Sequence, residues 1–312
     1  MSLHEFGHVL AGKLVGYRLF RLVVWPFIFV TSPGGLKIRY ARGVALFSGS
    51  TLSLPPNVPD VVRRQVILTL GGPVVSFLVA IAVFVVATRV HQAWMWGIAI
   101  AAAILVFSIL PTSGRTPSDG KRIVDLLFAG PRRERAVAML RIAALVRAGS
   151  RPRELPAELI QSACALSDGS FEEAVAHYNG FVWALDSGAI ESAKEHLDRA
   201  LAIYDPRQRH QIATAIEKAF MVARFEGDGP AARALLDASR GAYAHPHVRM
   251  RALAATLLAE GKADAALSAA SAALSSLDAC GEDLSQTLER DLIASLLYDA
   301  GALKAASPVA PG

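Results

Sequence analysis

The sequence predicts a mainly α-helical protein made of polytopic membrane helices, a small β-hairpin region and a C-terminal helical-repeat domain. Composition is the first observation behind this prediction: 53% hydrophobic residues, 19% charged residues and a mean hydropathy of +0.37 are too apolar for an ordinary soluble protein. The second is a pair of long apolar runs between residues 66 and 110. The third is a charge asymmetry, because residues 1–150 carry 17 Lys and Arg against 5 Asp and Glu, whereas residues 151–312 carry 15 against 22.

Residues 1–16 are expected to form a helix that carries His4-Glu5-Phe6-Gly7-His8. On a helix, His4 and His8 lie on one face and can bind a single metal ion. Glu5 lies about 100° around the axis, near enough to act on a water bound to that ion. A hydrolytic zinc site needs these groups, although so short a motif also occurs on ordinary helix surfaces. No apolar segment precedes His4, so we expect the chain as given to begin inside its first transmembrane helix.

Residues 17–58 differ from the segments on either side of them. They are rich in Val, Ile, Phe and Tyr, with Ser32-Pro33-Gly34-Gly35 in the middle and Pro55-Pro56 at the end. This pattern predicts short strands joined as hairpins.

The two apolar runs predict membrane spans at about 64–88 and 94–111, joined as a hairpin by a very short connection. Two buried core helices are the alternative, which the length of the runs and the lack of a polar stripe disfavour. Basic residues flank the outer ends of the pair, and Arg89 alone lies at the connection. The positive-inside rule therefore predicts that everything after residue 120 is cytoplasmic.

A zinc ion held by two histidines needs a third protein ligand. Acidic residues are scarce here, because residues 1–118 contain only Glu5 and Asp60. The next acid is Asp119, which follows the second apolar run in Pro117-Ser118-Asp119-Gly120. Asp119 is the candidate third ligand, and a turn residue or a helix N-cap is the alternative interpretation.

These motifs resemble the site-2 protease family of intramembrane zinc metallopeptidases. The resemblance covers about residues 1–128 and depends on HEFGH, on Gly72-Pro73-Val74-Val75-Ser76 and on the Pro-Ser-Asp-Gly segment, in the family's order. It implies that one zinc ion is bound by His4, His8 and Asp119 and that Glu5 is the general base.

The resemblance also implies residues that position the substrate, namely Gly72, Pro73, Ser76 and Ser108. Ser76 and Ser108 stand where the family usually has Asn, and a hydroxyl is shorter than an amide. For the glycines and proline at 71–73, close helix packing is the favoured alternative.

Residues 131–312 predict a cytoplasmic helical domain. Gly188, Gly227 and Gly261 are each followed five residues later by Ala193, Ala232 or Ala266, as expected for a helix, a tight turn and a second helix. The glycine intervals of 39 and 34 bracket the tetratricopeptide period, and an irregular bundle is the alternative. His245-Pro246-His247 is predicted to be a loop rather than a metal site.

The predicted protein is therefore a zinc-dependent intramembrane endopeptidase, with a catalytic domain at 1–130 and a helical domain at 131–312 that recruits or regulates substrate. A catalytically inactive membrane scaffold is the alternative. The predicted partners are the lipid bilayer, a membrane-protein substrate and a protein or peptide on the helical domain. We expect a multi-pass protein of a cell membrane, such as a bacterial inner membrane, that binds no nucleic acid, because the basic residues flank apolar runs.

Overall fold

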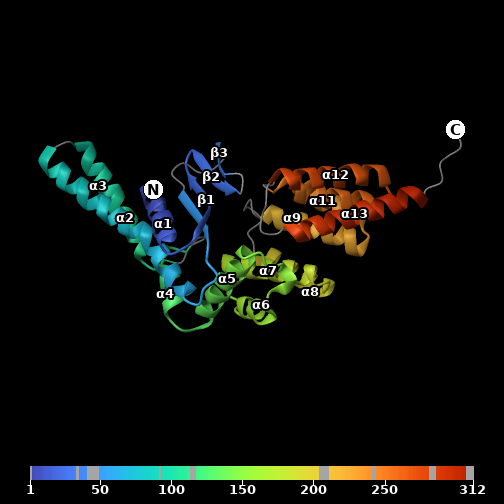
Figure 1. Ribbon diagram of the computed structural model, residues 1–312, viewed down its shortest axis with the longest axis horizontal. Helices are drawn as coiled ribbons and strands as arrows, with labels where there is room; N and C mark the ends of the chain where they lie inside the picture. Colours follow the sequence, from blue (N-terminus) through green and yellow to red (C-terminus); the bar gives the residue numbers. More distant parts are fainter. Residues whose placement is uncertain are drawn as a thin grey trace. The chain divides into compact units, whose positions relative to one another are not determined.

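The computed structural model describes residues 2–32, 35–40, 49–90, 93–112, 117–203, 211–240, 244–280 and 286–306. In this part of the chain helices predominate, and four strands form one antiparallel sheet (Figure 1). The prediction of a mainly α-helical protein with a small β region is confirmed.

The chain divides into two compact units, each of which is described by itself. Unit 1 contains residues 1–149 and 161–166, and unit 2 contains residues 150–160 and 167–312. The division falls near residue 149 rather than at 130, because helix α5 (Pro131–Arg147) packs on elements of unit 1. Arg147 in its last turn donates hydrogen bonds to the carbonyls of Gly16 and Leu54.

Unit 1 consists of helices and one sheet. Besides α5 its elements are α1 (Ser2–Leu14), β1 (Arg18–Val24), β2 (Phe27–Ser32), β3 (Gly35–Tyr40), β4 (Gly49–Leu54), α2 (Val61–Val90), α3 (Ala93–Val106), the 3-10 turn η1 (Phe107–Ile109) and α4 (Asp119–Leu127). The strands lie in the order β3-β2-β1-β4, so β3 and β4 form the edges. In β4, partly buried and exposed residues alternate, as expected for a strand that lies against another element on one face. That element is α1.

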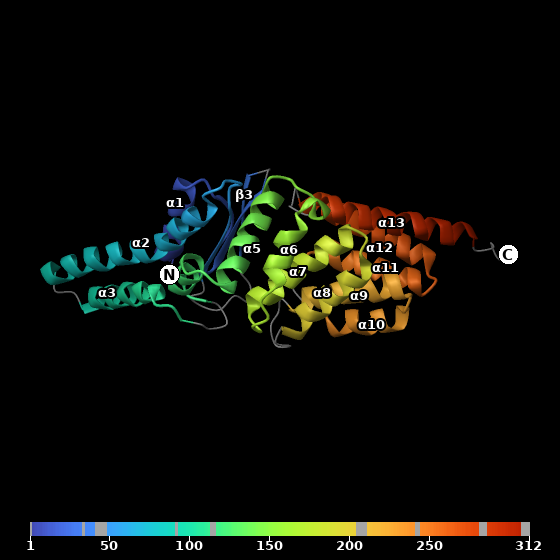
Figure 2. The ribbon, with the colours of Figure 1, turned by 90° about the horizontal axis from the view of Figure 1, so that it is seen from below.

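The apolar segment after the sheet forms a helical hairpin, in which α2 and α3 run side by side (Figure 2). In the described chain, one helix segment is long and apolar enough to cross a membrane, Val61–Val86, with a mean hydropathy of 2.4. The second predicted span is shorter than expected. Helix α3 ends at Val106 after 14 residues, because the chain tightens into η1 before Leu110.

Unit 2 is a stack of helices that follows the short turn η2 (Pro152–Glu154). Its helices are α7 (Phe171–Asp186), α8 (Ile190–Ile203), α9 (Gln211–Met221), the π-helical turn η3 (Val222–Glu226), α10 (Gly229–Ala238), α11 (Pro246–Ala259), α12 (Ala263–Cys280) and α13 (Gln286–Ala306), while α6 (Ala157–Cys164) is shared between the units.

The glycine and alanine pattern of residues 188–266 marks helix–turn–helix pairs, as predicted. Gly188, Gly227 and Gly261 have φ values of 75°, 71° and 75°, the left-handed conformation that ends a helix. The alanines five residues later, Ala193, Ala232 and Ala266, are almost completely buried, so each second helix packs closely on its neighbours. A kinship with tetratricopeptide repeats stays a prediction.

The prediction that His245-Pro246-His247 forms a loop was wrong for its last two residues. Pro246 is the first residue of α11, and His247 lies in the helix and is buried. Proline is tolerated at this position because the first N–H groups of a helix have no intrahelical partner.

The core of unit 2 contains a buried ionic cluster that the sequence did not suggest. Arg251 of α11 is 1% exposed and forms ion pairs with Glu217 of α9 and Glu289 of α13. Its guanidinium also lies 4.1 Å from the ring centroid of Phe220. Three helices of unit 2 are thus joined by one side chain.

Candidate metal centre

Helix α1 presents its motif to the interior of unit 1. His4, Glu5 and His8 are 6%, 8% and 7% exposed, and the two imidazole centroids are 4.9 Å apart. The spacing of four residues places both rings on one face, as predicted. The opposite face is the α1 apolar stripe, which is solvent-exposed and consists of Leu3, Phe6, Leu10 and Leu14.

Helix α2 lies unusually close to α1. A Cβ atom on Gly7 would be 2.3 Å from the carbonyl oxygen of Gly71, and one on Gly71 would be 2.3 Å from that of Gly7. Only glycine permits this approach. The close-packing interpretation of Gly71 is therefore confirmed, and the approach brings the next turn of α2 to the histidines.

Two groups on α2 hold the imidazoles. The backbone carbonyl of Leu68 lies 3.0 Å from Nδ1 of His8. The backbone N–H of Gly72 also lies 3.3 Å from this Nδ1 atom. In the tautomer in which Nδ1 donates to Leu68, Nε2 keeps its lone pair. The Ser76 hydroxyl lies 2.8 Å from Nδ1 of His4. In the tautomer in which Nδ1 carries the hydrogen, Ser76 accepts that hydrogen bond and the lone pair of Nε2 is available to a metal ion. Partners of this kind orient metal-binding histidines.

Asp119 reaches the histidines from the start of α4. The N-cap of that helix is Ser118, whose hydroxyl accepts a hydrogen bond from the N–H of Lys121, so Asp119 does not act as the cap. Gly120 lets the chain fold back, because a Cβ atom there would be 1.6 Å from the carbonyl oxygen of Ile109. The Ser108 hydroxyl donates to Oδ2 of Asp119 at 3.0 Å.

Asp119 and the two histidines converge on one point. Oδ2 of Asp119 is 3.1 Å from Nε2 of His4 and 3.6 Å from Nε2 of His8, and the three ligand atoms all lie within 4.8 Å of one another. Two ligand atoms each 2.0–2.1 Å from a tetrahedral zinc ion are about 3.3 Å apart. The two measured distances bracket that value. The donor set and its two distances to Asp119 therefore fit a divalent metal ion.

Gly72 faces this point directly. A Cβ atom at Gly72 would lie 2.4 Å from Nε2 of His8 and 2.7 Å from Nε2 of His4. The absence of a side chain therefore keeps the ligand nitrogens accessible. Pro73 lies inside α2.

Glu5 is held by a residue that the sequence analysis missed. The hydroxyl of Thr51 in β4 donates a hydrogen bond of 2.7 Å to Oε2 of Glu5. No sequence pattern links the two residues, because strand register alone determines which side of β4 faces α1.

The structure therefore unites His4, His8 and Asp119, with Gly72, Ser76 and Ser108 around them. The resemblance to the site-2 protease family implied that Gly72, Ser76 and Ser108 position the substrate. The contacts described here are instead with the candidate metal ligands: Ser76 with His4, and Ser108 with Asp119. A role in positioning substrate stays a prediction.

We expect Gly72→Ala to weaken metal binding by about 10- to 100-fold, the cost typical of disturbing the groups that orient metal ligands. The added methyl group would collide with both Nε2 atoms, and their rings are held in place by Ser76 and Leu68. The measurement is zinc affinity by competition with a chromogenic chelator.

Gly97→Ala in α3 is the matched control for this substitution, because a Cβ atom there would meet nothing within 4 Å. It should bind zinc as the unaltered protein does. Equal affinity of the Gly72 and Gly97 variants would contradict the assigned geometry.

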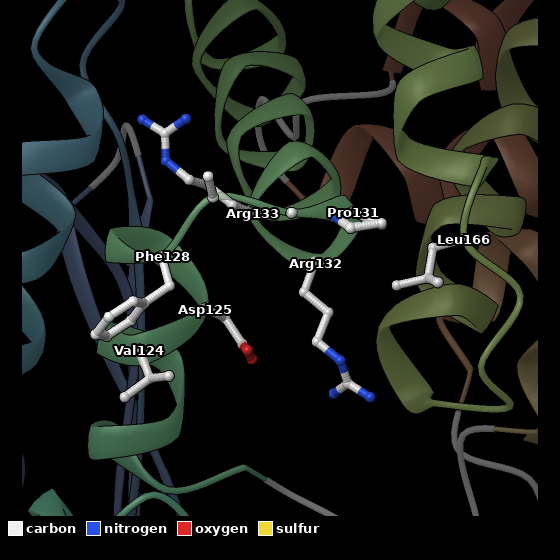
Figure 3. Close-up of a pocket in the computed structure, with 9 residues that line it drawn as sticks. Val124, Asp125, Phe128, Pro131, Arg132, Arg133 and Leu166 are labelled. Atoms are coloured by element: carbon white, nitrogen blue, oxygen red, sulfur yellow. The ribbon is translucent and has the colours of Figure 1, made fainter.

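A separate pocket of about 360 Å³ lies where α4 meets α5 (Figure 3). Its walls include Val124, Asp125, Phe128, Arg132 and Leu166, so it is distinct from the metal-binding group. Asp125 forms an ion pair with Lys121 on the same helix. We assign no chemistry to this pocket.

Comparison of the chain with protein-family profiles, with curated proteins and with solved structures gives no match.

Proposed function

We propose that this chain is a zinc-dependent intramembrane endopeptidase of the site-2 protease type, which cleaves a membrane-spanning protein. The observation that carries the proposal is the convergence of His4, His8 and Asp119 on one point. Asp119 lies 115 residues after His4 along the chain, and a carboxylate suited to act as a base, that of Glu5, is buried next to His4.

The distribution of apolar side chains supports a place in the bilayer. In the most apolar window of α2, 22% of the residues are buried by the protein, whereas the core helix of a soluble protein would be mostly buried. Exposed large apolar residues also form the α1 apolar stripe and continue on α3 with Trp96, Ile98 and Ile100. Exposed apolar surface this extensive is typical of a membrane interface. We propose that α1, α2 and α3 together lie in a cell membrane, such as a bacterial inner membrane.

Helix α3 is short for a span on its own. Its 14 residues extend about 21 Å, against a hydrocarbon core of about 30 Å. Non-helical backbone is tolerated at membrane depth where it lies against protein. Turn η1 lies against α2 and α4, so the backbone of Phe107–Ile109 satisfies this condition.

The charge pattern supports a cytoplasmic C-terminal part. Basic residues follow the hairpin in the sequence, which the positive-inside rule associates with the cytoplasm. Stacked helix pairs in unit 2 offer a surface for a peptide or a protein partner. We propose that unit 2 recruits or regulates the substrate.

In the proposed reaction His4, His8 and Asp119 would hold a zinc ion, which when bound would supply Lewis-acid polarisation of the scissile carbonyl and a water whose pKa is lowered to roughly 7. Glu5 accepts a proton from the water and later returns it to the leaving amine. Ser76 and Leu68 fix the orientation of the imidazoles, and Ser108 fixes that of the Asp119 carboxylate.

A helical substrate must expose its scissile carbonyl by unwinding locally. Strand β4 is an edge of the sheet and carries Thr51, which is bonded to Glu5. We propose that the extended substrate segment adds to this edge by β-strand pairing.

The inactive scaffold is the weaker interpretation. Part of its support was the replacement of two expected Asn residues by Ser76 and Ser108. Both serines contact the proposed metal ligands, and Glu5 accepts a hydrogen bond from the partly buried Thr51. A scaffold has no need of these contacts.

The proposal is tested on protein extracted from membranes with detergent. We expect one zinc ion per chain by elemental analysis, and cleavage of β-casein, an unfolded substrate, that stops with 1,10-phenanthroline and returns on addition of Zn²⁺. A zinc-free protein that binds no added Zn²⁺, or cleavage that is insensitive to the chelator, would refute the proposal.

A further inference from the structure

Strand β4 turns one face toward the motif helix. Gly49, Thr51 and Ser53 are partly buried on this face, while Ser50 and Leu52 between them are exposed. The register is fixed by the pairing of β4 with β1, in which Thr51 lies opposite Leu22. Because side chains alternate along a strand, a shift of one residue would turn Thr51 away from α1.

Two contacts from this face enclose the side chain of Glu5. The Thr51 hydroxyl donates to Oε2 at 2.7 Å and lies 3.4 Å from the backbone oxygen of Glu5. Gly49 lies directly against the same side chain, since a Cβ atom there would be 2.7 Å from Cγ and 3.0 Å from Oε1 of Glu5. The carboxylate thus has a hydrogen-bond donor on one side and close backbone on the other.

We propose that Thr51 is a positioning residue that holds Glu5 in the orientation needed for a general base; the inference rests on the proposed function. A glutamate side chain has three rotatable bonds, so an unrestrained carboxylate samples many positions. The bond from Thr51 to Oε2 restricts these rotations. Misplacement of a reacting group by about 1 Å can cost roughly 100-fold in rate.

The test compares Thr51→Val, which keeps the branched shape but removes the hydroxyl, with Thr51→Ser, which keeps the hydroxyl. For the zinc-loaded protein in detergent we expect Thr51→Val to lower kcat for β-casein by roughly 10- to 100-fold, with KM and zinc content unchanged. Thr51→Ser should stay within about three-fold of the unaltered protein.

A second readout does not depend on turnover. Acetohydroxamate binds zinc while the base carboxylate accepts its proton, so its affinity reports the position of Glu5. We expect the dissociation constant, measured by calorimetry, to rise about ten-fold in Thr51→Val and to stay unchanged in Thr51→Ser. Ser53→Ala removes a hydroxyl from the same face of β4 and should alter neither quantity.

Gly49→Ala displaces the same carboxylate from its other side and should also lower kcat without loss of zinc. The inference is overturned if Thr51→Val keeps normal kcat and hydroxamate affinity, or if Thr51→Ser loses as much as Thr51→Val. In either case zinc binding and cleavage by the unaltered protein would leave the proposed function intact. An unaltered protein that neither binds zinc nor cleaves casein would overturn both.

Discussion

Glu5→Gln is expected to retain one zinc ion per chain and to lose about 10³-fold or more in kcat for β-casein. General base catalysis contributes roughly 10² to 10⁴ in rate, and an amide cannot accept a proton from water at neutral pH. The amide oxygen can still accept the hydrogen bond from Thr51, so the packing between α1 and β4 should be preserved. Steady-state kinetics and elemental analysis of the same preparation measure the two quantities.

Glu134→Gln is a suitable control, since that exposed residue in the first turn of α5 is outside the site. It should cleave casein at the normal rate. If Glu5→Gln cleaved within ten-fold of the unaltered protein, another group would have to be the base.

Asp119→Ala is expected to remove zinc from the purified protein. The substitution deletes the oxygen that lies 3.1 Å from His4 and 3.6 Å from His8, and leaves two imidazoles as the protein ligands. The loss of affinity should exceed the roughly 10- to 100-fold that follows removal of an outer-shell partner. Zinc content after dialysis, determined by elemental analysis, is the measurement.

Asp125→Ala is the matched control for this second prediction. Asp125 lies on the same helix and pairs with Lys121 rather than with a histidine. Its variant should keep its zinc and its rate of cleavage. Full zinc content in Asp119→Ala would remove Asp119 from the ligand set and with it the proposed centre.

Part of the candidate metal centre is predictable from the sequence because the geometry of its two histidines is local. Helical spacing alone places His4 and His8 together, and the scarcity of acids before Asp119 left few candidates for the third ligand. Long-range proximity was inferred from a family resemblance, and the structure places the three ligand atoms within 4.8 Å of one another.

The groups around the ligands were not predictable in the same way. Thr51 contacts Glu5 through the register of an edge strand, which depends on pairing between segments distant in sequence. The hydroxyls of Ser76 and Ser108 were identified by motif position, but which atoms they contact depends on how α1, α2 and α4 pack.

Errors in the helical regions have local causes. The apolar run after residue 94 was treated as one helix, yet the chain tightens into η1 at Phe107, because hydropathy does not report hydrogen-bond pattern. Pro246 was taken to exclude a helix, whereas it begins one. In contrast, the glycines at 188, 227 and 261 located turns correctly because their left-handed φ values favour glycine.

The wide separation of the metal-binding residues along the chain has a consequence for assembly of the protein. A bound ion would close a loop of more than a hundred residues between α1 and α4, acting as a reversible cross-link whose binding free energy adds to folding. The last ligand to be synthesised, Asp119, follows the whole α2–α3 hairpin. In the proposed protease, the three-ligand site can be completed only after Asp119 has been synthesised, so a nascent chain would pass through a stage that lacks the complete site.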